Sequence, residues 1–287
     1  MTRVVQEARA LREACDALRA QPLRVGFVPT MGALHAGHMS LVQAARAHGA
    51  ERVVLSIFVN PMQFGPREDF SRYPRMLESD LALCREHGVD LVYAPDAQAM
   101  YPPGFQTHVE VEHLTQGFEA AARPTHFRGV TTVVAKLLHA VGPCTAVFGR
   151  KDYQQWRVLD RMVRDLDMPV TVVGCPIVRE SDGLALSSRN RYLDEHQRPR
   201  ATAIHRGLSL ADAAYRQGER QADALEAAAR APIAERFDAV EYVTLADADT
   251  LEVCTGRAQR PVVLLVAARL GATRLLDNAV LGQDGLA

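Results

Sequence analysis

Apolar residues in the first 175 positions form short, nearly continuous runs that alternate with segments of helical spacing. The run at residues 52–59, Arg-Val-Val-Leu-Ser-Ile-Phe-Val, is typical of a strand buried on both faces of a parallel sheet. The pattern predicts further strands at 25–28, 89–93, 145–148 and 170–173. It also predicts helices at 74–87 and 130–141, one helix that starts near residue 36, and one that ends at residue 166. Strands and helices alternating at this spacing indicate βαβ units and a doubly wound parallel sheet.

Two segments depart from this rhythm. Residues 3–20 repeat apolar positions at helical spacing and are predicted to form an amphipathic helix. Residues 95–129 contain Tyr-Pro-Pro-Gly at 101–104 and a short alternating run at 107–111 that favours a strand. Such a long excursion inside an α/β domain often forms part of a site or a subunit contact.

The pattern changes near residue 178, where a polar, cationic and glycine-bearing stretch runs to 191. Helices are predicted at 194–217 and 220–236, and strands at 239–245, 262–268 and 274–276. We therefore expect an α/β domain with a doubly wound parallel sheet over residues 1–177 and a smaller C-terminal α+β domain over 178–287.

Composition narrows the functional classes. The net charge of −1 over 287 residues gives no global field for nucleic acid or an anionic membrane. The longest apolar run, 262–268, is too short to span a bilayer, and the N-terminal residues do not resemble a signal peptide. The five scattered cysteines include no C-x-x-C pair, so we expect reduced thiols and a cytoplasmic location.

Candidate chemistry begins at the loop after the first predicted strand. The strand is expected to break at Pro29 and Gly32, and a helix restarts near residue 36. A strand, loop and helix start of this kind presents unpaired backbone N–H groups to an anion. His35 and His38 lie on one side of the first helical turn, and Gly37 lets a flat ligand approach the backbone. The stretch therefore indicates a nucleotide-phosphate site.

Other interpretations of the histidine pair remain open at this point. Two of ten histidines can fall three residues apart near a helix start without any function. A zinc site is a weaker alternative, because no suitable third ligand lies nearby in the sequence. A second polar loop supports the nucleotide interpretation: residues 149–155 follow the strand at 145–148, and ligands of open α/β sheets bind at such carboxyl ends. That loop is expected to face His35 and His38.

Five segments taken together resemble the pantothenate synthetase (pantoate–β-alanine ligase) family. They are PTMGALHAGH at 29–38, FVNPMQF at 58–64, HFRGV at 126–130, FGRKDYQQ at 148–155 and SSRN at 187–190, and TRLLDN at 273–278 extends the resemblance over nearly the whole chain. Arg150 and Thr125 depart from the residues usual in the family. Each segment alone is a weak signal, whereas their order along one chain is highly specific.

The resemblance implies an ATP-dependent ligation in two steps. The carboxylate of pantoate attacks the α-phosphate of ATP, which gives pantoyl adenylate and pyrophosphate. The amine of β-alanine then attacks the acyl carbon and releases pantothenate and AMP. The resemblance also implies a homodimer with a Rossmann-like N-terminal domain and a C-terminal lid, and we expect Mg²⁺ to arrive with ATP.

The resemblance also implies residue roles. His35, His38 and Lys151 are expected to act on the phosphates as pyrophosphate leaves. Gln63 and Gln155 are expected to hold pantoate, because an amide both donates and accepts, and Gln63 is also expected to contact β-alanine. The implied ATP-binding residues are Met31, Gly32, Ala33, Leu34, His35, Ala36, Gly37, His38, Gly149, Arg150, Lys151, Asp152, Val178, Leu186, Ser187, Ser188 and Arg189.

Alternatives remain for the residues and for the activity. Lys151 alone is compatible with a solvated charge, Gln155 with a helix surface, and the Ser187–Ser188 pair with a helix cap. Asp80 offers an outer-shell carboxylate for Mg²⁺, but no motif assigns it. Nucleotidylyltransferases and class I aminoacyl-tRNA synthetases also carry H-x-G-H after a first strand, and a non-catalytic nucleotide-binding module is a third class.

Overall fold

The computed structural model describes residues 2–21, 23–66 and 68–285. The chain folds as two compact units, the first comprising Met1–Arg150 and Gln154–Cys175, the second comprising Lys151–Tyr153 and Pro176–Ala287. The main division, after Cys175, lies close to the predicted boundary between residues 177 and 178. Within the described residues, no helix is long and apolar enough to cross a bilayer.

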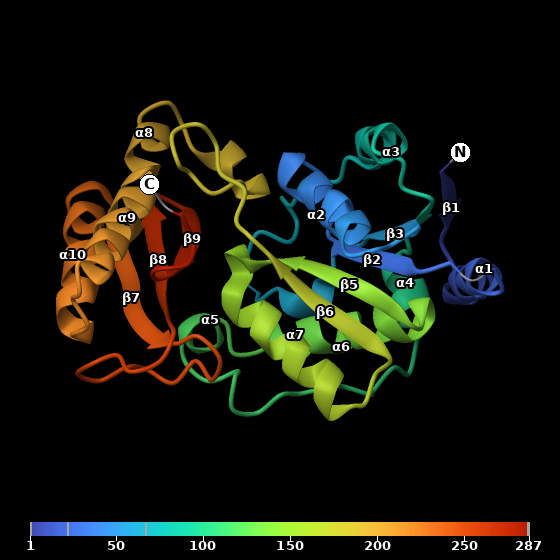
Figure 1. The fold of residues 1–287 in the computed structure, drawn as a ribbon. Coiled ribbons are helices and arrows are strands. Elements are labelled where there is room, and N and C mark those ends of the chain that lie inside the picture. Colours follow the sequence, from blue (N-terminus) through green and yellow to red (C-terminus); the bar gives the residue numbers. More distant parts are fainter. Residues whose placement is uncertain (1, 22, 67, 286–287) are drawn as a thin grey trace. The chain divides into compact units, whose positions relative to one another are not determined.

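The first unit contains a six-stranded, all-parallel sheet in the order β1-β4-β3-β2-β5-β6 (Figure 1). Its strands are β1 (Arg3–Val5), β2 (Val25–Thr30), β3 (Arg52–Ile57), β4 (Leu91–Tyr93), β5 (Cys144–Gly149) and β6 (Val170–Cys175). The chain moves outward from β2 through β3 and β4, and then returns to the other side of β2 to form β5. The order therefore reverses between β2 and β5, which is where ligands of doubly wound sheets bind. The prediction of a doubly wound parallel sheet is confirmed.

Helices cover both faces of this sheet (Figure 1). On one face α1 (Ala8–Arg19), α6 (His126–Val141) and α7 (Tyr153–Asp165) pack around Phe27. On the other face α2 (Ala36–Ala47) and α3 (Leu77–Glu86) pack around Val28. Phe27 and Val28 are both 0% exposed, because successive side chains of a strand point to opposite faces and both faces are covered. This is why the strands have nearly continuous apolar sequences.

The N-terminal segment corrects the prediction of one helix over residues 3–20. Residues 3–5 form strand β1, which pairs in parallel with β4, and the helix begins only at Ala8. Val5 pairs with Tyr93 and is 8% exposed, whereas Val4 is 40% exposed. Pairing with a strand almost ninety positions away overrides the local helical spacing.

Strand β2 does not break at Pro29, as the sequence suggested, but continues to Thr30. Pro29 pairs in register with Ser56 of β3, while pairing with β5 covers only Gly26 and Phe27. Proline has no N–H to donate to a ladder. It is tolerated here because it lies beyond the residues of β2 that pair with β5.

The excursion at 95–129 also differs from its prediction. Residues 107–111 are not a strand; instead, the backbone of Val109 is held by the hydroxyls of Thr131 and Thr132 on α6, at 2.6 and 3.1 Å. The segment contains the short helices α4 (Ala97–Met100) and α5 (Phe118–Ala122). Helix α6 begins at His126, earlier than the predicted residue 130, so the HFRGV segment forms its first turn.

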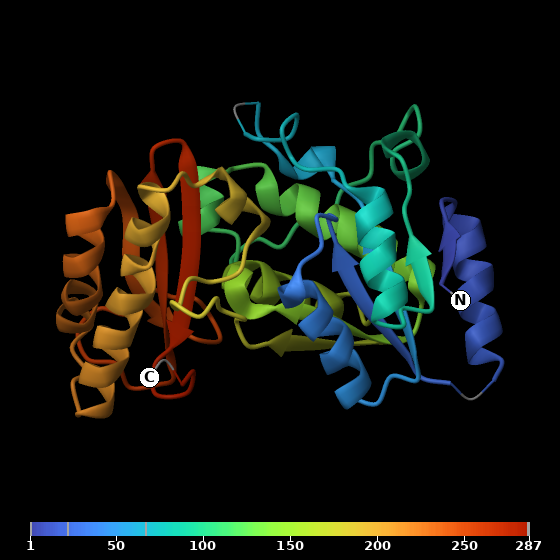
Figure 2. The ribbon, with the colours of Figure 1, turned by 90° about the horizontal axis from the view of Figure 1, so that it is seen from above.

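The second unit is a three-stranded antiparallel sheet of β7 (Ala239–Asp247), β8 (Val262–Leu270) and β9 (Thr273–Val280). Helices α9 (Ala203–Arg216) and α10 (Ala222–Arg236) pack on one face of it (Figure 2). The predicted helix over 194–217 is interrupted, because α8 (Gln197–Ala201) ends before α9 begins. At the break the Thr202 hydroxyl donates to the carbonyl oxygen of Pro199 at 2.8 Å, a local bond that competes with the helical one.

Helix α6 lies unusually close to the single-turn helix η1 (Pro61–Gln63). A Cβ at Gly129 would lie 2.4 Å from the Met62 carbonyl oxygen and 2.6 Å from the Gln63 nitrogen. Alanine normally favours a helix interior by about 1 kcal/mol over glycine. Here the helix or the turn has to move, and such overpacking costs about 1–3 kcal/mol.

We therefore expect Gly129→Ala to lower the thermal unfolding midpoint and to displace the turn that carries Gln63. Gly285→Ala, where a Cβ meets no atom within 4 Å, is the control and should leave the midpoint unchanged. An unchanged or raised midpoint for Gly129→Ala would show that α6 does not depend on this close approach.

Candidate active site

The loop between β2 and α2 does not present free backbone N–H groups at its centre. Gly32 and Ala33 have left-handed backbones, with φ of 79° and 50°. The Asp80 carboxylate fills the concavity that this backbone forms, accepting from Ala33 N–H at 2.9 Å and from Leu34 N–H at 2.8 Å. Asp80, on α3, is 2% exposed. The predicted set of unpaired donors is therefore wrong at these positions.

The same contacts change the interpretation of Asp80. Both of its carboxylate oxygens already accept backbone N–H groups in a buried site. It holds the loop in shape through these two bonds.

The donors at the start of α2 come from the two histidine rings. His35 is the N-cap residue, and its Nδ1 accepts from Gly37 N–H at 3.2 Å. The Nδ1 of His38 accepts from His35 N–H at 3.3 Å. A neutral imidazole that accepts at Nδ1 carries its proton on Nε2. Both rings are thus Nε2–H donors, with centroids 4.1 Å apart.

Gln63 lies on η1 and its amide has one defined orientation. Asn60, 1% exposed, accepts from Met62 N–H through Oδ1 at 3.2 Å and donates through Nδ2 to the Gly129 carbonyl at 3.1 Å. Its second Nδ2 contact, to Gln63 at 3.0 Å, must therefore be a donation to Oε1. Tyr101 OH also donates to Asn60 Oδ1 at 2.8 Å.

The side-chain nitrogen of Gln63 points toward Met31, in the loop between β2 and α2. Gln63 Nε2 lies 3.2 Å from the thioether sulfur of Met31. A thioether is a weak acceptor, whereas a carboxylate or hydroxyl oxygen is a strong one. The structure thus brings together Met31 and Gln63, which the sequence assigned to ATP and pantoate, and supplies an amide donor beside them.

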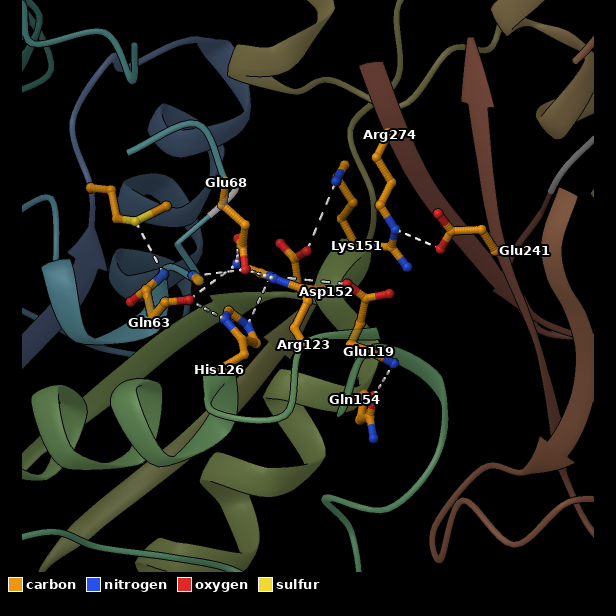
Figure 3. A network of polar contacts seen from close by, with 12 residues as sticks. Gln63, Glu68, Glu119, Arg123, His126, Lys151, Asp152, Gln154, Glu241 and Arg274 are labelled. Carbon is orange, nitrogen blue, oxygen red and sulfur yellow. Dashed lines mark hydrogen bonds and ion pairs between the residues drawn. The ribbon is translucent and has the colours of Figure 1, made fainter. Parts of the chain in front are cut away.

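A buried polar network supports the backbone of Gln63 (Figure 3). His126 Nδ1 lies 3.0 Å from the Gln63 carbonyl oxygen and Arg123 Nη1 lies 3.2 Å from His126 Nε2, so the ring donates through Nδ1 and accepts through Nε2. Arg123 also forms an ion pair with Glu68 at 2.5 Å. The sequence singled out the segment containing His126 but gave this residue no role.

Burial and the nearby Arg123 cation lower the pKa of His126 to about 4. Burial opposes ionisation of Glu68, yet its hydrogen bond with Arg123 keeps the pKa of that carboxyl below its ordinary value. The network therefore combines a neutral imidazole with the Arg123 guanidinium and its two carboxylate neighbours, Glu68 and Glu119.

Two adjacent glutamines at the start of α7 have different surroundings. Gln154 is 3% exposed; it accepts from Glu119 N–H at 3.0 Å and donates to the Leu114 carbonyl at 2.9 Å (Figure 3). It anchors the 114–119 segment. Gln155, the predicted pantoate residue, is half-buried.

Gly149 is the last residue of β5, the strand beside β2, and Arg150 follows it. They therefore lie at the same edge of the sheet as the start of the histidine loop, at the reversal of strand order. A Cβ at Gly149 would meet no atom within 4 Å, so the backbone borders open space.

The remaining predicted nucleotide residues belong to the second unit. Val178 and Leu186 are brought together, because Leu186 N–H donates to the Val178 carbonyl at 2.9 Å across a small hairpin. Ser187 Oγ accepts from Arg189 N–H at 3.3 Å and caps the short helix η3 (Ser188–Tyr192). Lys151 Nζ lies 3.9 Å from a carboxylate oxygen of Asp152, and both residues lie in the single turn η2 (Arg150–Asp152).

Within residues 2–21, 23–66 and 68–285, no group of three or more His, Cys, Asp or Glu side chains is placed to hold a metal ion. The described residues thus offer no such cluster of protein ligands. They are compatible with Mg²⁺ that is carried by the phosphates of ATP and keeps most of its waters.

The sheet order, the histidine-bearing loop between β2 and α2 and the oriented amide beside it define an α/β protein of Rossmann-like topology with a nucleotide-type site. A family model described as pantoate-beta-alanine ligase matches residues 3–280. The chain therefore belongs to the pantoate–β-alanine ligase family.

Individual relatives agree with this assignment. The chain is 50% identical over 279 residues to a pantothenate synthetase of Moorella thermoacetica, covering 97% of this chain and 98% of the relative. A crystal structure of pantothenate synthetase from Thermus thermophilus superposes with a TM-score of 0.91 at 46% identity, covering 97% of this chain and 99% of that one. A pantoate-beta-alanine ligase from Francisella tularensis, complexed with beta-gamma ATP and beta-alanine, has a TM-score of 0.79 at 28% identity and covers all of both chains.

The ring contacts predict different outcomes for two substitutions of His38. In His38→Asn the amide oxygen can replace Nδ1 as acceptor for His35 N–H, but nothing replaces the Nε2–H donor. In His38→Gln the amide nitrogen reaches the position of Nε2. If the ring donates to a phosphate during adenylation, loss of that donor should slow the step by about two to three decades.

We expect His38→Asn to retain the thermal midpoint while adenylation slows to that extent, and His38→Gln to be the more active variant. Single-turnover release of pyrophosphate measures the step. Higher activity in His38→Asn than in His38→Gln would mean that Nδ1, not Nε2, faces the substrate.

The pKa of His126 predicts a loss of stability on acidification. The native ring stays neutral down to about pH 4, whereas in the unfolded chain it binds a proton near pH 6.5. Between about pH 4 and pH 6.5 the unfolded state therefore binds more protons than the native state. The stabilisation from the neutral His126 ring is fully present above pH 6.5. Falling pH removes up to about 3 kcal/mol of unfolding free energy.

Urea unfolding at pH 6.5 and pH 4.5 should show a smaller loss in His126→Gln than in the unaltered chain. His196→Gln removes a histidine whose side chain is 87% exposed and should leave the loss unchanged. Equal losses in all three proteins would show that His126 is not held neutral.

Proposed function

We propose that this chain condenses pantoate with β-alanine at the expense of ATP, through a pantoyl-adenylate intermediate, and releases AMP and pyrophosphate. The main support for the proposal is the contact between Gln63 Nε2, an oriented amide donor, and Met31 in the loop between β2 and α2. Membership of the pantoate–β-alanine ligase family supports the same reaction, as does the relative complexed with beta-gamma ATP and beta-alanine.

Adenylation requires preorganised donors and cations, because negative charge moves onto the departing pyrophosphate as the pantoate carboxylate attacks. We assign the Nε2–H groups of His35 and His38 to the phosphates. Lys151 supplies a compact cation suited to the same group. Gly149, Arg150, Asp152 and the remaining residues of the 31–38 loop complete the nucleotide contacts.

The second unit contributes Val178 and Leu186 toward the adenine, and Ser187, Ser188 and Arg189 toward the phosphates. Gln63 and Gln155 hold pantoate by its hydroxyls and carboxylate, and Gln63 also contacts β-alanine. In the second step the β-alanine amine attacks the acyl carbon, the acyl–phosphate bond breaks and AMP leaves. Mg²⁺ arrives with ATP as part of that substrate. We also propose a cytoplasmic homodimer.

Product analysis separates this function from the other classes with an H-x-G-H segment. Incubation with ATP, Mg²⁺, pantoate and β-alanine should give AMP and pantothenate in equal amounts. Exchange of labelled pyrophosphate into ATP should require pantoate but not β-alanine. Exchange that appears only with β-alanine would contradict the stepwise route, and a dinucleotide-like product would indicate a nucleotidylyltransferase.

Lys151 is predicted to act in the first step only. The β and γ phosphates leave as pyrophosphate in that step and are absent from the second. Lys151→Met should therefore slow adenylation by about two to three decades, the usual result of removing one preorganised transition-state contact. Isolated pantoyl adenylate supplied with β-alanine should react at nearly the unaltered rate.

Single-turnover kinetics of each half-reaction provides the measurement. Lys136→Met removes the lysine whose Nζ lies 4.8 Å from the Phe105 ring, and serves as the matched control with both steps intact. An equal loss of both steps in Lys151→Met would show that this residue holds the adenylate or the fold.

A further inference from the structure

Strand β9 contains two adjacent buried polar residues whose purpose the reaction does not explain. Asp277 is 4% exposed and Asn278 is 2% exposed, and both lie within the TRLLDN segment near the end of the chain. Successive residues of a strand point to opposite faces, so the pair addresses two different neighbours.

Asp277 interrupts an apolar row. Leu275 and Ala279, two positions before and after it on the same face, belong to the core beneath α9 and α10. A carboxylate at this place loses its hydration, and an apolar side chain would commonly be at least as stabilising. A carboxylate at this position is therefore better explained by positioning than by stability.

The neighbour of Asp277 is the hairpin that carries Val178 and Leu186. Arg179 donates to both carboxylate oxygens of Asp277, at 2.6 and 3.0 Å, and to the Gly183 carbonyl at 3.0 Å. The bidentate pair fixes the plane of the guanidinium as well as its distance. Asp277 therefore orients Arg179, which in turn connects the first arm of the hairpin to its turn at Gly183.

The hairpin in turn positions the helix η3. Asn190 Nδ2 donates to the Ala185 carbonyl and to Glu180 Oε1, both at 3.1 Å. Glu180 also pairs with Arg198 at 2.6 Å. The 187–189 segment that precedes Asn190 is thus connected to Asp277 through short polar contacts.

The neighbour of Asn278 is the segment that carries Lys151. Asn278 Nδ2 donates to the Lys151 carbonyl oxygen at 2.8 Å, and the backbone N–H of Asn278 donates to Asp277 Oδ1 at 2.8 Å. The Asp277 carboxylate is therefore bonded to the backbone of the residue whose side chain holds Lys151. Lys151 and the 178–189 segment both belong to the second unit, and β9 connects them.

We propose that Asp277 and Asn278 are positioning residues for nucleotide use: together they set the Lys151 backbone and the 178–189 segment in one fixed relation. The inference rests on the proposed function, which assigns both segments to ATP. Neither residue is assigned a contact with substrate. They act by aligning the Lys151 cation and the hairpin that carries Val178 and Leu186 before ATP binds.

Asp277→Asn is the first test, and Asp212→Asn is a matched control in the same unit. Asp212 is also 4% exposed, pairs with Arg216 at 2.7 Å and accepts from Gly282 N–H at 2.6 Å. Both substitutions alter a buried carboxylate that pairs with an arginine and accepts a backbone N–H, so both should lower the thermal midpoint. Only Asp277→Asn should weaken ATP binding, by about tenfold, as measured by titration calorimetry.

Kinetic measurements distinguish positioning from loss of fold. In Asp277→Asn the KM for ATP should rise about tenfold, while the KM for pantoate and the reaction of isolated pantoyl adenylate with β-alanine change little. Asn278→Ala should slow adenylation, because Lys151 loses its anchor, with a smaller effect on the thermal midpoint.

A double substitution tests the route from Asp277. If Asp277 acts through Arg179, then Asp277→Asn should add little to the ATP-binding loss of Arg179→Met. Additive losses would contradict that route, and equal ATP affinities for Asp277→Asn and Asp212→Asn would overturn the inference. Failure of the unaltered chain to form pantothenate would instead contradict the proposed function, while the calorimetric comparison still decides the role of Asp277.

Discussion

The site depends on one constraint: the backbone donors of the 32–38 loop must be satisfied before any substrate arrives. A left-handed pair of residues and a helix start leave several N–H groups pointing into a small space. Asp80 accepts two of them and the histidine rings accept two more at Nδ1. Because the rings are used in this way, their remaining nitrogens become defined donors. With these backbone donors already engaged, the imidazole Nε2–H groups are the donors that we propose for the phosphates.

The polar groups of the neighbouring residues are likewise engaged before any substrate arrives. Asn60 has both ends of its amide engaged, and this fixes which end of Gln63 is the donor. His126 is kept neutral by burial and by Arg123, so it supports the Gln63 carbonyl without placing a further charge under the site. Polar groups one layer removed from the substrate residues thus decide orientation and protonation in advance.

The parallel sheet and the histidine loop were predictable from the sequence because their signals are local. A strand buried on both faces must be apolar throughout, and the order of strands and helices then restricts the topology. The candidate residues could also be named from the motifs, and their roles stay predictions. The strand at residues 3–5 and the start of α6 at His126 could not be predicted, because pairing and packing with distant segments determine both.

The supporting residues were beyond prediction for a related reason. Asp80 is an ordinary acidic residue on an amphipathic helix until the fold places it under the 33–34 backbone. Asp277 and Asn278 belong to a recognisable segment, but their roles depend on neighbours about a hundred positions away. A sequence indicates which chemistry is present, whereas these contacts determine the atom through which each group acts.

The most direct test of this account is the tautomer of the two histidines in the unliganded protein. Long-range proton–nitrogen NMR spectra of a chain with ¹⁵N-labelled histidine distinguish a protonated from an unprotonated ring nitrogen, and His35→Asn and His38→Asn assign the signals. We expect a protonated Nε2 and an accepting, unprotonated Nδ1 in both rings near neutral pH. A proton on Nδ1 of either ring would contradict it.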